Sequence, residues 1–339
     1  MTNKEIAEIL NITPAAVSMA LHNKGGVSSA KKKQILQLKY KSDDVKVKTE
    51  KKGTLLFAIH KRNGNVISET HFFITIMATI QEFAEEKGYY VDIIHYDQKM
   101  DFNEFISRID MDTISGILIL ATEMTSADVT LYKKFNKPLV IIDNWFPGEQ
   151  YNCVLMDNED GMRQAVRYAY EMGHRRIGFV RSKTPLNNFT ERFNGYLRGM
   201  REVGLPVYKK NIFYTKCTSD GAYEDMTEII KNTKELPTCL LVSNDIMAMG
   251  IMNALKYAHY NVPKDVSIIS FDNMPVAKYF NPAITSVNIH DEKIGIIAVR
   301  RMLEILEDDE KDYFVHNLVG VTLEIRESVY DLSLQNNMK

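Results

Sequence analysis

The sequence predicts an α/β protein in which a small helical head precedes two doubly wound lobes of parallel sheet. Two observations support this fold class: apolar runs alternate with amphipathic segments after residue 53, and a short lysine-rich helical stretch precedes them. A chain of 339 residues is long enough for two or three packed units. We expect a head at 1–41, a linker or degenerate hinge at 42–52, a two-lobed domain at 53–330 and a polar tail at 331–339.

The alternation of strands and helices defines the two lobes. The expected strands are Thr54–His60, Tyr90–Tyr96, Gly116–Leu120, Leu139–Ile142, Arg176–Val180, Ile212–Tyr214, Cys239–Val242 and Val266–Ile269. The expected helices are about His71–Lys87, Asn103–Ile109, Ser126–Phe135, Gly161–Met172, Phe189–Val203, Ala222–Lys231 and Ile246–Tyr257. A connecting strand and a long helix follow Pro282, and a final strand pair is expected around Phe314–Leu318 and Val321–Arg326. The first lobe is assigned 53–155 and 287–312, and the second 156–284 and 315–330.

Composition excludes several classes of protein. Charged residues make up 25% of the chain and hydrophobic residues 45%, which are ordinary values for a globular protein. No apolar run approaches the roughly 20 residues of a membrane span, and the N-terminus does not resemble a signal peptide, so a cytoplasmic protein without a membrane partner is expected. The three cysteines lie far apart without CxxC spacing, which argues against disulfides and zinc sites. No metal or cofactor is expected.

Charge is distributed unevenly along the chain. Residues 1–52 contain 11 lysines against five acidic residues, a net charge of +6, whereas the remainder carries 31 basic against 39 acidic residues, a net charge of −8. A localised basic end attracts a phosphate backbone, and an acidic body does not. The alternative is that these lysines are simply solvated.

The head contains the pattern of two short helices joined by a tight turn. Thr2 and Glu5 have the spacing of a capping box, and Ile6, Ala7, Ile9 and Leu10 then give the first helix one apolar face. Thr13 is placed to cap a second helix that begins at Pro14. Val17, Ala20 and Leu21 are expected to pack this helix inward, which predicts a helix-turn-helix followed by a lysine-rich third helix.

The second helix of the head presents a different set of side chains outward. Projected on a helix starting at Pro14, the side chains that point away from the packed face are Ala15, Ser18, Met19 and His22. Lys24 and Lys31, with the two lysines after it, are assigned to phosphate contacts, which position a protein on DNA without specifying sequence. Ala15, Ser18, Met19, His22, Lys24 and Lys31 are therefore candidate DNA-binding residues, and Thr13 and Pro14 at the start of the helix are included with them.

In the body, the stretch 238–273 predicts a polar ligand site. It contains two apolar runs joined by an amphipathic helix, and the runs end in Ser-Asn-Asp and Phe-Asp-Asn. Parallel strands place Asn244, Asp245 and Asp272 at the same edge of the sheet, where ligands of open α/β sheets bind. These residues suit a ligand rich in hydroxyl groups. The alternative is that they only cap the next helix or shape a turn.

The head sequence KEIAEILNITPAAVSMALHNKGGVS resembles the DNA-binding head of the lactose-repressor/galactose-repressor (LacI/GalR) family of transcription regulators. The resemblance implies that Pro14, Ala15 and Met19 face the major groove. The family often has arginine where this chain has Met19, and methionine cannot make the bidentate contact to guanine that arginine makes, so apolar and backbone contacts are expected instead.

The hinge departs from the family pattern. The segment between Val27 and Tyr40 is about one helical turn shorter, and Ser42-Asp43 replaces the usual Pro-Asn. The family's minor-groove leucine corresponds to Thr49, which is a poor wedge between base pairs. We therefore expect residues 43–52 to be a flexible linker, disordered without DNA.

The resemblance extends over nearly the whole body through GHRRIGFV, ERFNGYLRGM, VSNDIMAMGIMNAL, VPKDVSIISFDN and NPAITSVNIHDEKIG. It implies the ligand-sensing domain of the same family, which is similar to periplasmic sugar-binding proteins and closes like a clam around its ligand. By position, Arg192, Asn244 and Asp272 match effector-contacting residues, and Phe72 and Phe73 match positions beside the ligand. A guanidinium, an amide and a carboxylate together hold several hydroxyl groups at fixed angles.

Three aromatic residues outside these matches complete the candidate ligand site. Trp145 and Phe146 follow the strand end at Asp143 and offer a flat face for a sugar ring, and Phe189 is a candidate on the opposite lobe. The candidate ligand residues are therefore Phe72, Phe73, Asp143, Trp145, Phe189, Arg192, Asn244 and Asp272. The alternatives are a core role for the phenylalanines and a plain ion pair between Arg192 and Asp272.

No catalytic motif is present: the sequence lacks GxSxG, HExxH, a P-loop, and GxGxxG after a strand. We therefore expect no catalytic residues and no enzyme. The hypothesis is a ligand-responsive regulator, a repressor by family resemblance, that binds operator DNA as a homodimer and a small-molecule effector, a carbohydrate. The rival hypothesis is a soluble sugar-binding module with a degenerate head, and an enzyme acting on a sugar is the third option.

Overall fold

The computed structural model describes residues 2–21, 27, 31–32, 34–35, 38, 52–62, 71–308 and 313–333. Predictions for His22 and Lys24, for most of the linker and for the end of the polar tail lie outside these residues. The described chain divides into a small N-terminal unit and a large body that begins at Gly53. We describe each unit by itself.

The head begins with the two helices expected from its sequence, α1 (Asn3–Leu10) and α2 (Pro14–Leu21). The capping box is confirmed: the Glu5 amide donates to the Thr2 hydroxyl, and the Thr2 amide donates to the Glu5 carboxylate. The Thr13 hydroxyl likewise accepts from the Ala16 amide at 3.2 Å and caps α2. The small core of the head consists of Ile6, Ala7, Val17, Ala20 and Ile35.

One residue expected on the apolar face of α1 lies elsewhere. The Ile9 side chain is 58% exposed, whereas Ile6 and Ala7 are buried. A helix of eight residues presents only about two turns, so its buried stripe includes Ile6 and Ala7 and leaves Ile9 on the outer face.

The first sheet of the body is entirely parallel in the order β11-β5-β4-β3-β1-β2. Its strands are β1 (Gly53–Lys61), β2 (Tyr89–Asp97), β3 (Ile114–Leu120), β4 (Leu139–Ile142), β5 (Asn152–Met156) and β11 (His316–Val319). Its helices are α4 (His71–Glu86), α5 (Phe102–Ser107), α6 (Ser126–Tyr132) with the 3-10 turn η1 (Lys133–Phe135), and α11 (Asp291–Glu307).

The second sheet has the order β12-β10-β9-β8-β6-β7, and only β12 is antiparallel. Its strands are β6 (Ile177–Ser182), β7 (Ile212–Thr215), β8 (Cys239–Val242), β9 (Ser267–Asp272), β10 (Thr285–Asn288) and β12 (Thr322–Glu324). Its helices are α7 (Asn158–Glu171), α8 (Asn187–Glu202), α9 (Ser219–Asn232) and α10 (Asp245–Tyr257), with 3-10 turns η2 (Lys209–Asn211) and η3 (Pro275–Tyr279).

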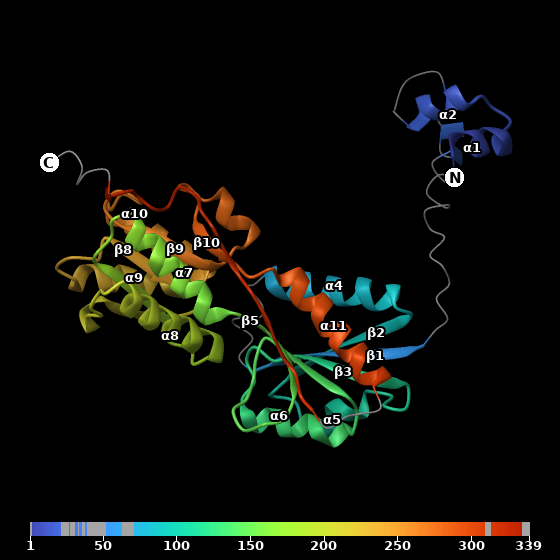
Figure 1. Cartoon of the computed structure of the whole chain (residues 1–339), viewed down its shortest axis with the longest axis horizontal. Coiled ribbons are helices and arrows are strands. Elements are labelled where there is room, and N and C mark those ends of the chain that lie inside the picture. Colours follow the sequence, from blue (N-terminus) through green and yellow to red (C-terminus); the bar gives the residue numbers. More distant parts are fainter. Residues whose placement is uncertain are drawn as a thin grey trace. The chain divides into compact units, whose positions relative to one another are not determined.

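Each sheet is covered by helices on both faces, as a doubly wound fold requires. In the first lobe, α4 and α11 lie on one face and α5 and α6 on the other (Figure 1). In the second lobe, α7 and α8 pack on one face, and α9 and α10 on the other. Because both faces are buried, the strands read as nearly continuous apolar runs rather than as alternating ones.

The last two strands do not form the pair that the sequence suggested. β11 adds to β5 in the first sheet, whereas β12 pairs with β10 in the second. β11 therefore belongs to the first lobe, and β10, the expected connecting strand, is a member of the second sheet. The chain crosses between the sheets after β5, after β10 and after β11, which ties the lobes together at three points.

No helix in the described residues is long and apolar enough to cross a membrane. The expected character of the cysteines is confirmed, since Cys153, Cys217 and Cys239 are buried free thiols. Burial raises the pKa of Cys153 to about 12, so this thiol stays protonated and behaves as a small core residue.

Candidate functional site: the cleft between the two sheets

Strand ends from both sheets meet at one cavity of the body. The first lobe contributes residues that follow β3 and β4 and residues on α4, and the second contributes residues that follow β8 and β9 and the start of α8. The cavity is lined by Phe72, Phe73, Leu120, Thr122, Asp143, Met156, Leu186, Asn188, Phe189, Arg192, Asn244, Asp272 and Ile289. Sheet edges of this kind are where ligands of α/β proteins bind.

All the predicted ligand residues except Trp145 line this cavity. Trp145 is half-buried, and its indole N–H donates to the Glu191 carboxylate on α8 at 2.7 Å. Phe146 is buried in the core of the first lobe. The prediction that Trp145 and Phe146 form the ring-stacking face is therefore wrong for this conformation, in which Phe72, Phe73 and Phe189 supply the aromatic surface.

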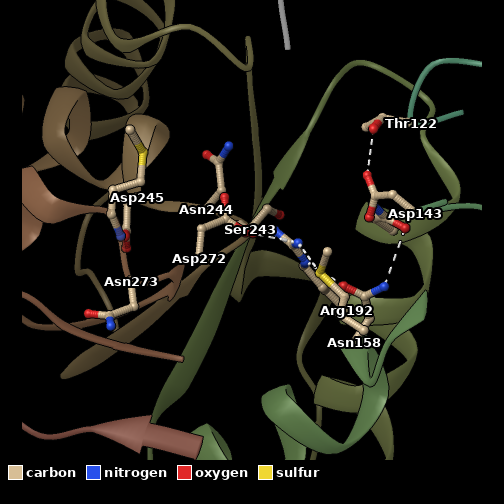
Figure 2. A network of polar contacts seen from close by, with 12 residues as sticks. Thr122, Asp143, Asn158, Arg192, Ser243, Asn244, Asp245, Asp272 and Asn273 are labelled. Carbon is tan, nitrogen blue, oxygen red and sulfur yellow. Dashed lines mark hydrogen bonds and ion pairs between the residues drawn. The ribbon is translucent and has the colours of Figure 1, made fainter. Parts of the chain in front are cut away.

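Arg192 is the centre of the polar network (Figure 2). Its Nε donates to Asn158 Oδ1 at 2.8 Å, and its Nη1 donates to the Ser243 carbonyl oxygen at 2.7 Å. Its Nη2 lies 3.0 Å from Asp272 Oδ1, and the guanidinium stacks 3.9 Å from the centre of the Phe271 ring. The ion pair between Arg192 and Asp272, which the sequence left open as an alternative to ligand binding, is thus present in the structure. Both residues also line the cavity.

A chain of side-chain hydrogen bonds links this ion pair to the first lobe. Asn158 donates to Asn188 Oδ1 at 3.3 Å, and Asn188 donates to Asp143 Oδ1 at 2.9 Å. The Thr122 hydroxyl donates to the other oxygen of Asp143 at 2.5 Å. Apart from Asn244, the polar side chains that line the cavity therefore belong to one connected network that spans both lobes.

Further hydrogen bonds join the first two turns of α8 to the segment after β4. Asn187 Nδ2 donates to Asn144 Oδ1 at 2.7 Å, and Glu191 accepts from both Trp145 Nε1 and Asn158 Nδ2. These contacts hold the lobes in a closed arrangement. The free volume of the central cavity is accordingly only about 30 Å³, room for about two water molecules.

Two of the acidic residues that line the cavity, Asp143 and Asp272, have a positive backbone φ angle. The φ angle is 69° at Asp143, which follows β4, and 101° at Asp272, which is the last residue of β9. Such conformations cost non-glycine residues on the order of 1–3 kcal/mol each and concentrate at functional sites. Both residues line the cleft.

Asp245 has a structural role in shaping a loop, which was the alternative to ligand binding for the residues at these strand ends. It is fully buried, and its carboxylate accepts from the Met274 amide at 2.6 Å and from the Ser286 hydroxyl at 2.7 Å. Asp245 therefore fixes the loop after β9 against β10. Burial, with the nearby charge of Asp272, raises the pKa of Asp245 to about 7.

Asn244 combines a structural contact with a free donor. Its Oδ1 accepts from the Met247 amide at 3.0 Å and caps α10, so the helix-capping alternative is confirmed for this oxygen. Its amide nitrogen has no acceptor within the described part of the chain, and the residue lines the cavity. The side-chain NH2 group of Asn244 can therefore donate a hydrogen bond to a ligand.

The sequence prediction missed Thr122, Asn158 and Asn188, which complete the network. Thr122 follows the end of β3, so the strand-end argument that identified Asp143 applies equally to it. Asn158 and Asn188 lie in the first turns of α7 and α8. No local pattern distinguishes them from other helix-start asparagines.

The titration of Asp143 gives a testable pH dependence. Burial raises the pKa of Asp143 to about 7 from 3.8, so its stabilising contribution is fully present below pH 3.8 and is lost as the pH rises through 7. Asp143→Asn mimics the protonated form. Between pH 4 and 8, the free energy of unfolding of the unmodified protein should therefore fall relative to that of the variant by up to about 4 kcal/mol, at about 1.4 kcal/mol per pKa unit.

Urea denaturation at a series of pH values measures this difference. The exposed Asp112→Asn is the matched control and should give a pH profile parallel to that of the unmodified protein. Parallel profiles for Asp143→Asn as well would show that the Asp143 carboxyl group titrates normally.

In the head, the described candidate residues lie as predicted. Ala15 and Met19 are exposed on α2, Ser18 is half-buried, and Val17 and Ala20 face the core. Thr13 and Pro14 are exposed at the start of the helix. Lys31 is helical and half-buried. The outer face of α2 is therefore available for contact with DNA, and its role there remains a prediction.

Known proteins resemble this chain over both its N-terminal head and its two-lobed body. A family model described as a periplasmic binding protein-like domain matches residues 166–329. The HTH-type transcriptional repressor PurR of Actinobacillus pleuropneumoniae serotype 3 (strain JL03) is 24% identical over 322 residues, which cover 92% of this chain and 93% of that protein. The match therefore includes the head as well as the lobes. The chain is thus similar over nearly its whole length to HTH-type transcriptional repressors.

Solved structures of LacI/GalR regulators share the fold. A transcriptional regulator CelR in complex with cellobiose superimposes with a TM-score of 0.74 at 21% identity, covering 97% of this chain and 99% of that one. The lac repressor dimer bound to operator and the anti-inducer ONPF gives a TM-score of 0.70 at 17% identity, covering 97% and 99%. At these identities the likeness concerns the fold, and the ligand of this chain is a separate question.

Proposed function

We propose that this protein is a ligand-responsive transcriptional repressor that binds operator DNA through its head and a sugar or sugar-like effector in the cleft. The observation that carries the proposal is the convergence of Arg192, Asn244 and Asp272 on one cavity between two closing lobes. Effector binding shifts the equilibrium between lobe arrangements, and the operator affinity changes with it.

The chemistry of the cavity supports a sugar. Arg192 and the Asn244 amide donate hydrogen bonds, and Asp143 and Asp272 accept them, so ring hydroxyl groups find partners of both kinds. Phe72, Phe73 and Phe189 offer apolar faces for the C–H groups of a sugar ring. Because the closed cavity has little free volume, a sugar enters only when the contacts between α8 and the segment after β4 open.

The exposed residues of the head support a form of DNA binding in which no arginine contacts the bases. Met19 and Ala15 are exposed on the same helix, and such side chains contact thymine methyl groups rather than guanine. One head with weak base readout gives low specificity, so two heads on two half-sites are needed. We therefore propose a homodimer, and exposed apolar side chains on the body offer surface for a second copy: Ile74, Tyr90, Tyr257, Val276 and Tyr279.

A gel-shift experiment with the region upstream of the protein's own gene tests DNA binding. We expect retardation at low salt that weakens as salt rises, because phosphate contacts release counterions. Ala15→Asp should reduce the affinity at least about tenfold, because it places a carboxylate in the major groove between the two phosphate backbones. An acidic residue near the start of α2 remains compatible with the helix. The exposed Glu8→Gln on α1 is the matched control and should bind as the unmodified protein does.

Sugars added to the same gels test the coupling between cleft and head. A change in operator affinity with one sugar and not with others supports an effector. No retardation at low salt, with or without sugars, would favour the rival hypothesis of a sugar-binding module with a degenerate head.

A further inference from the structure

A second cavity lies at the other end of the first sheet, where β4 and β5 begin and α11 ends. Its volume is about 500 Å³, far larger than that of the closed cleft. Its lining includes Lys133, Lys137, Tyr151, Arg301, Asp308 and Tyr313. All of these residues belong to the first lobe, so the cavity does not depend on how the lobes close.

Cations outnumber carboxylates in this lining. Lys133 pairs with Glu149 at 2.9 Å and Arg301 with Glu304 at 3.0 Å, whereas Lys137 has no ion pair with any residue that the structure describes. The partner carboxylates are at least partly exposed, and ion pairs of that kind contribute little and exchange readily. Among the described residues of the lining the one carboxylate is Asp308, which already accepts from the Tyr313 hydroxyl at 3.0 Å. The cavity therefore favours an anion.

Tyr151 provides an independent indication of a ligand. Its side chain is 7% exposed. The Lys133 ammonium lies beside its hydroxyl group but can only donate, and the O–H has no acceptor among the described residues. A buried O–H without an acceptor costs about 1–3 kcal/mol, so such groups are rare in folded proteins. Burial raises the pKa of Tyr151, which keeps the hydroxyl protonated and able to donate. A ligand oxygen would satisfy it.

The walls of the cavity indicate the rest of the ligand. Apolar and aromatic side chains, among them Leu139, Ile305 and Phe314, surround the charged groups. The guanidinium of Arg301 is buried and fixed, because its Nε donates to Asn152 Oδ1 at 2.8 Å. A flat ring fits between such walls while an anionic group meets the cations.

We propose that this cavity is a second effector site for a small ring-bearing metabolite that carries a phosphate or a carboxylate group. The site also has a direct connection to the cleft. β4 begins here at Leu139 and leads to Asp143, and β5 begins at Asn152 and ends at Met156, each spanning roughly 13 Å. Occupation of the second site therefore shifts the strand ends that line the first, and the two ligands alter each other's affinity.

Binding of AMP, glucose 6-phosphate, benzoate and inorganic phosphate to the full chain, measured by calorimetry, tests the proposal. We expect at least one ring-bearing anion to bind with a dissociation constant below about 1 mM and more tightly than inorganic phosphate. The phosphate esters and benzoate distinguish which anionic group is preferred. If none of the four binds, the proposal is wrong.

Variants locate the site. Lys137→Gln should weaken binding at least tenfold, and Tyr151→Phe at least threefold without lowering the melting temperature of the free protein, because it removes an O–H that has no acceptor. The exposed Lys256→Gln is the matched charge control and should bind normally. Phe72→Ala, in the cleft, should also bind normally. Loss of binding in Phe72→Ala with normal binding in Lys137→Gln would place the anion in the cleft and overturn the proposal.

Discussion

Replacement of Arg192 by alanine should lower the free energy of unfolding by about 3–5 kcal/mol and abolish stabilisation by the effector. The reason is that Arg192 is 3% exposed and lies 3.0 Å from Asp272, which would be left as a buried charge without its partner. Asn158 and the Ser243 carbonyl oxygen would also lose their donors. Urea denaturation measures the first effect, and thermal shifts across a panel of mono-, di- and oligosaccharides measure the second.

A pair of variants separates the charge effect from the loss of the ligand contact. Arg192→Met combined with Asp272→Asn removes both charges, and asparagine tolerates the left-handed backbone at position 272. The double variant should be more stable than Arg192→Met alone and should still fail to respond to sugars. An unchanged sugar response in either variant would remove Arg192 from the site.

Gly250→Ala should destabilise the second lobe by about 3 kcal/mol, close to the largest effect expected of one added methyl group. Gly250 lies where α10 crosses α9, and a Cβ there would overlap the Ser219 carbonyl oxygen and lie 2.9 Å from the Tyr223 amide nitrogen. These are backbone atoms of α9 and cannot rotate away as a side chain would. Relief requires the two helices to separate, which loosens the packing behind Asn244.

Gly320→Ala is the matched control for this prediction. It adds the same methyl group at an exposed position where no atom lies within 4 Å of the new Cβ, so its effect should stay within about 0.5 kcal/mol. Urea denaturation of both variants gives the comparison. Equal stabilities would show that α9 and α10 have room to move apart.

The cleft illustrates which parts of a site can be found from sequence. Asp143, Asn244 and Asp272 each follow an apolar run, and parallel strands bring such positions to one edge whatever the details of packing. Arg192 came from the family resemblance, because an arginine on a helix, 21 residues after α7 ends, has no local signal of its function. Trp145 was misplaced for the opposite reason: its residue type suggested ring stacking, but its indole nitrogen reaches Glu191 on another element.

The sequence by itself determined the order and type of the elements, the caps of α1 and α2, and the convergence of the strand-end residues. These follow from the helical and strand periodicities and from capping chemistry, which act over a few residues. Only the tertiary structure decided that β11 and β12 join different sheets, that α8 bonds to the segment after β4, and that the Tyr151 O–H lacks an acceptor among the described residues. Each of these depends on the distance between groups far apart in the chain, and such distances are set by packing rather than by local pattern.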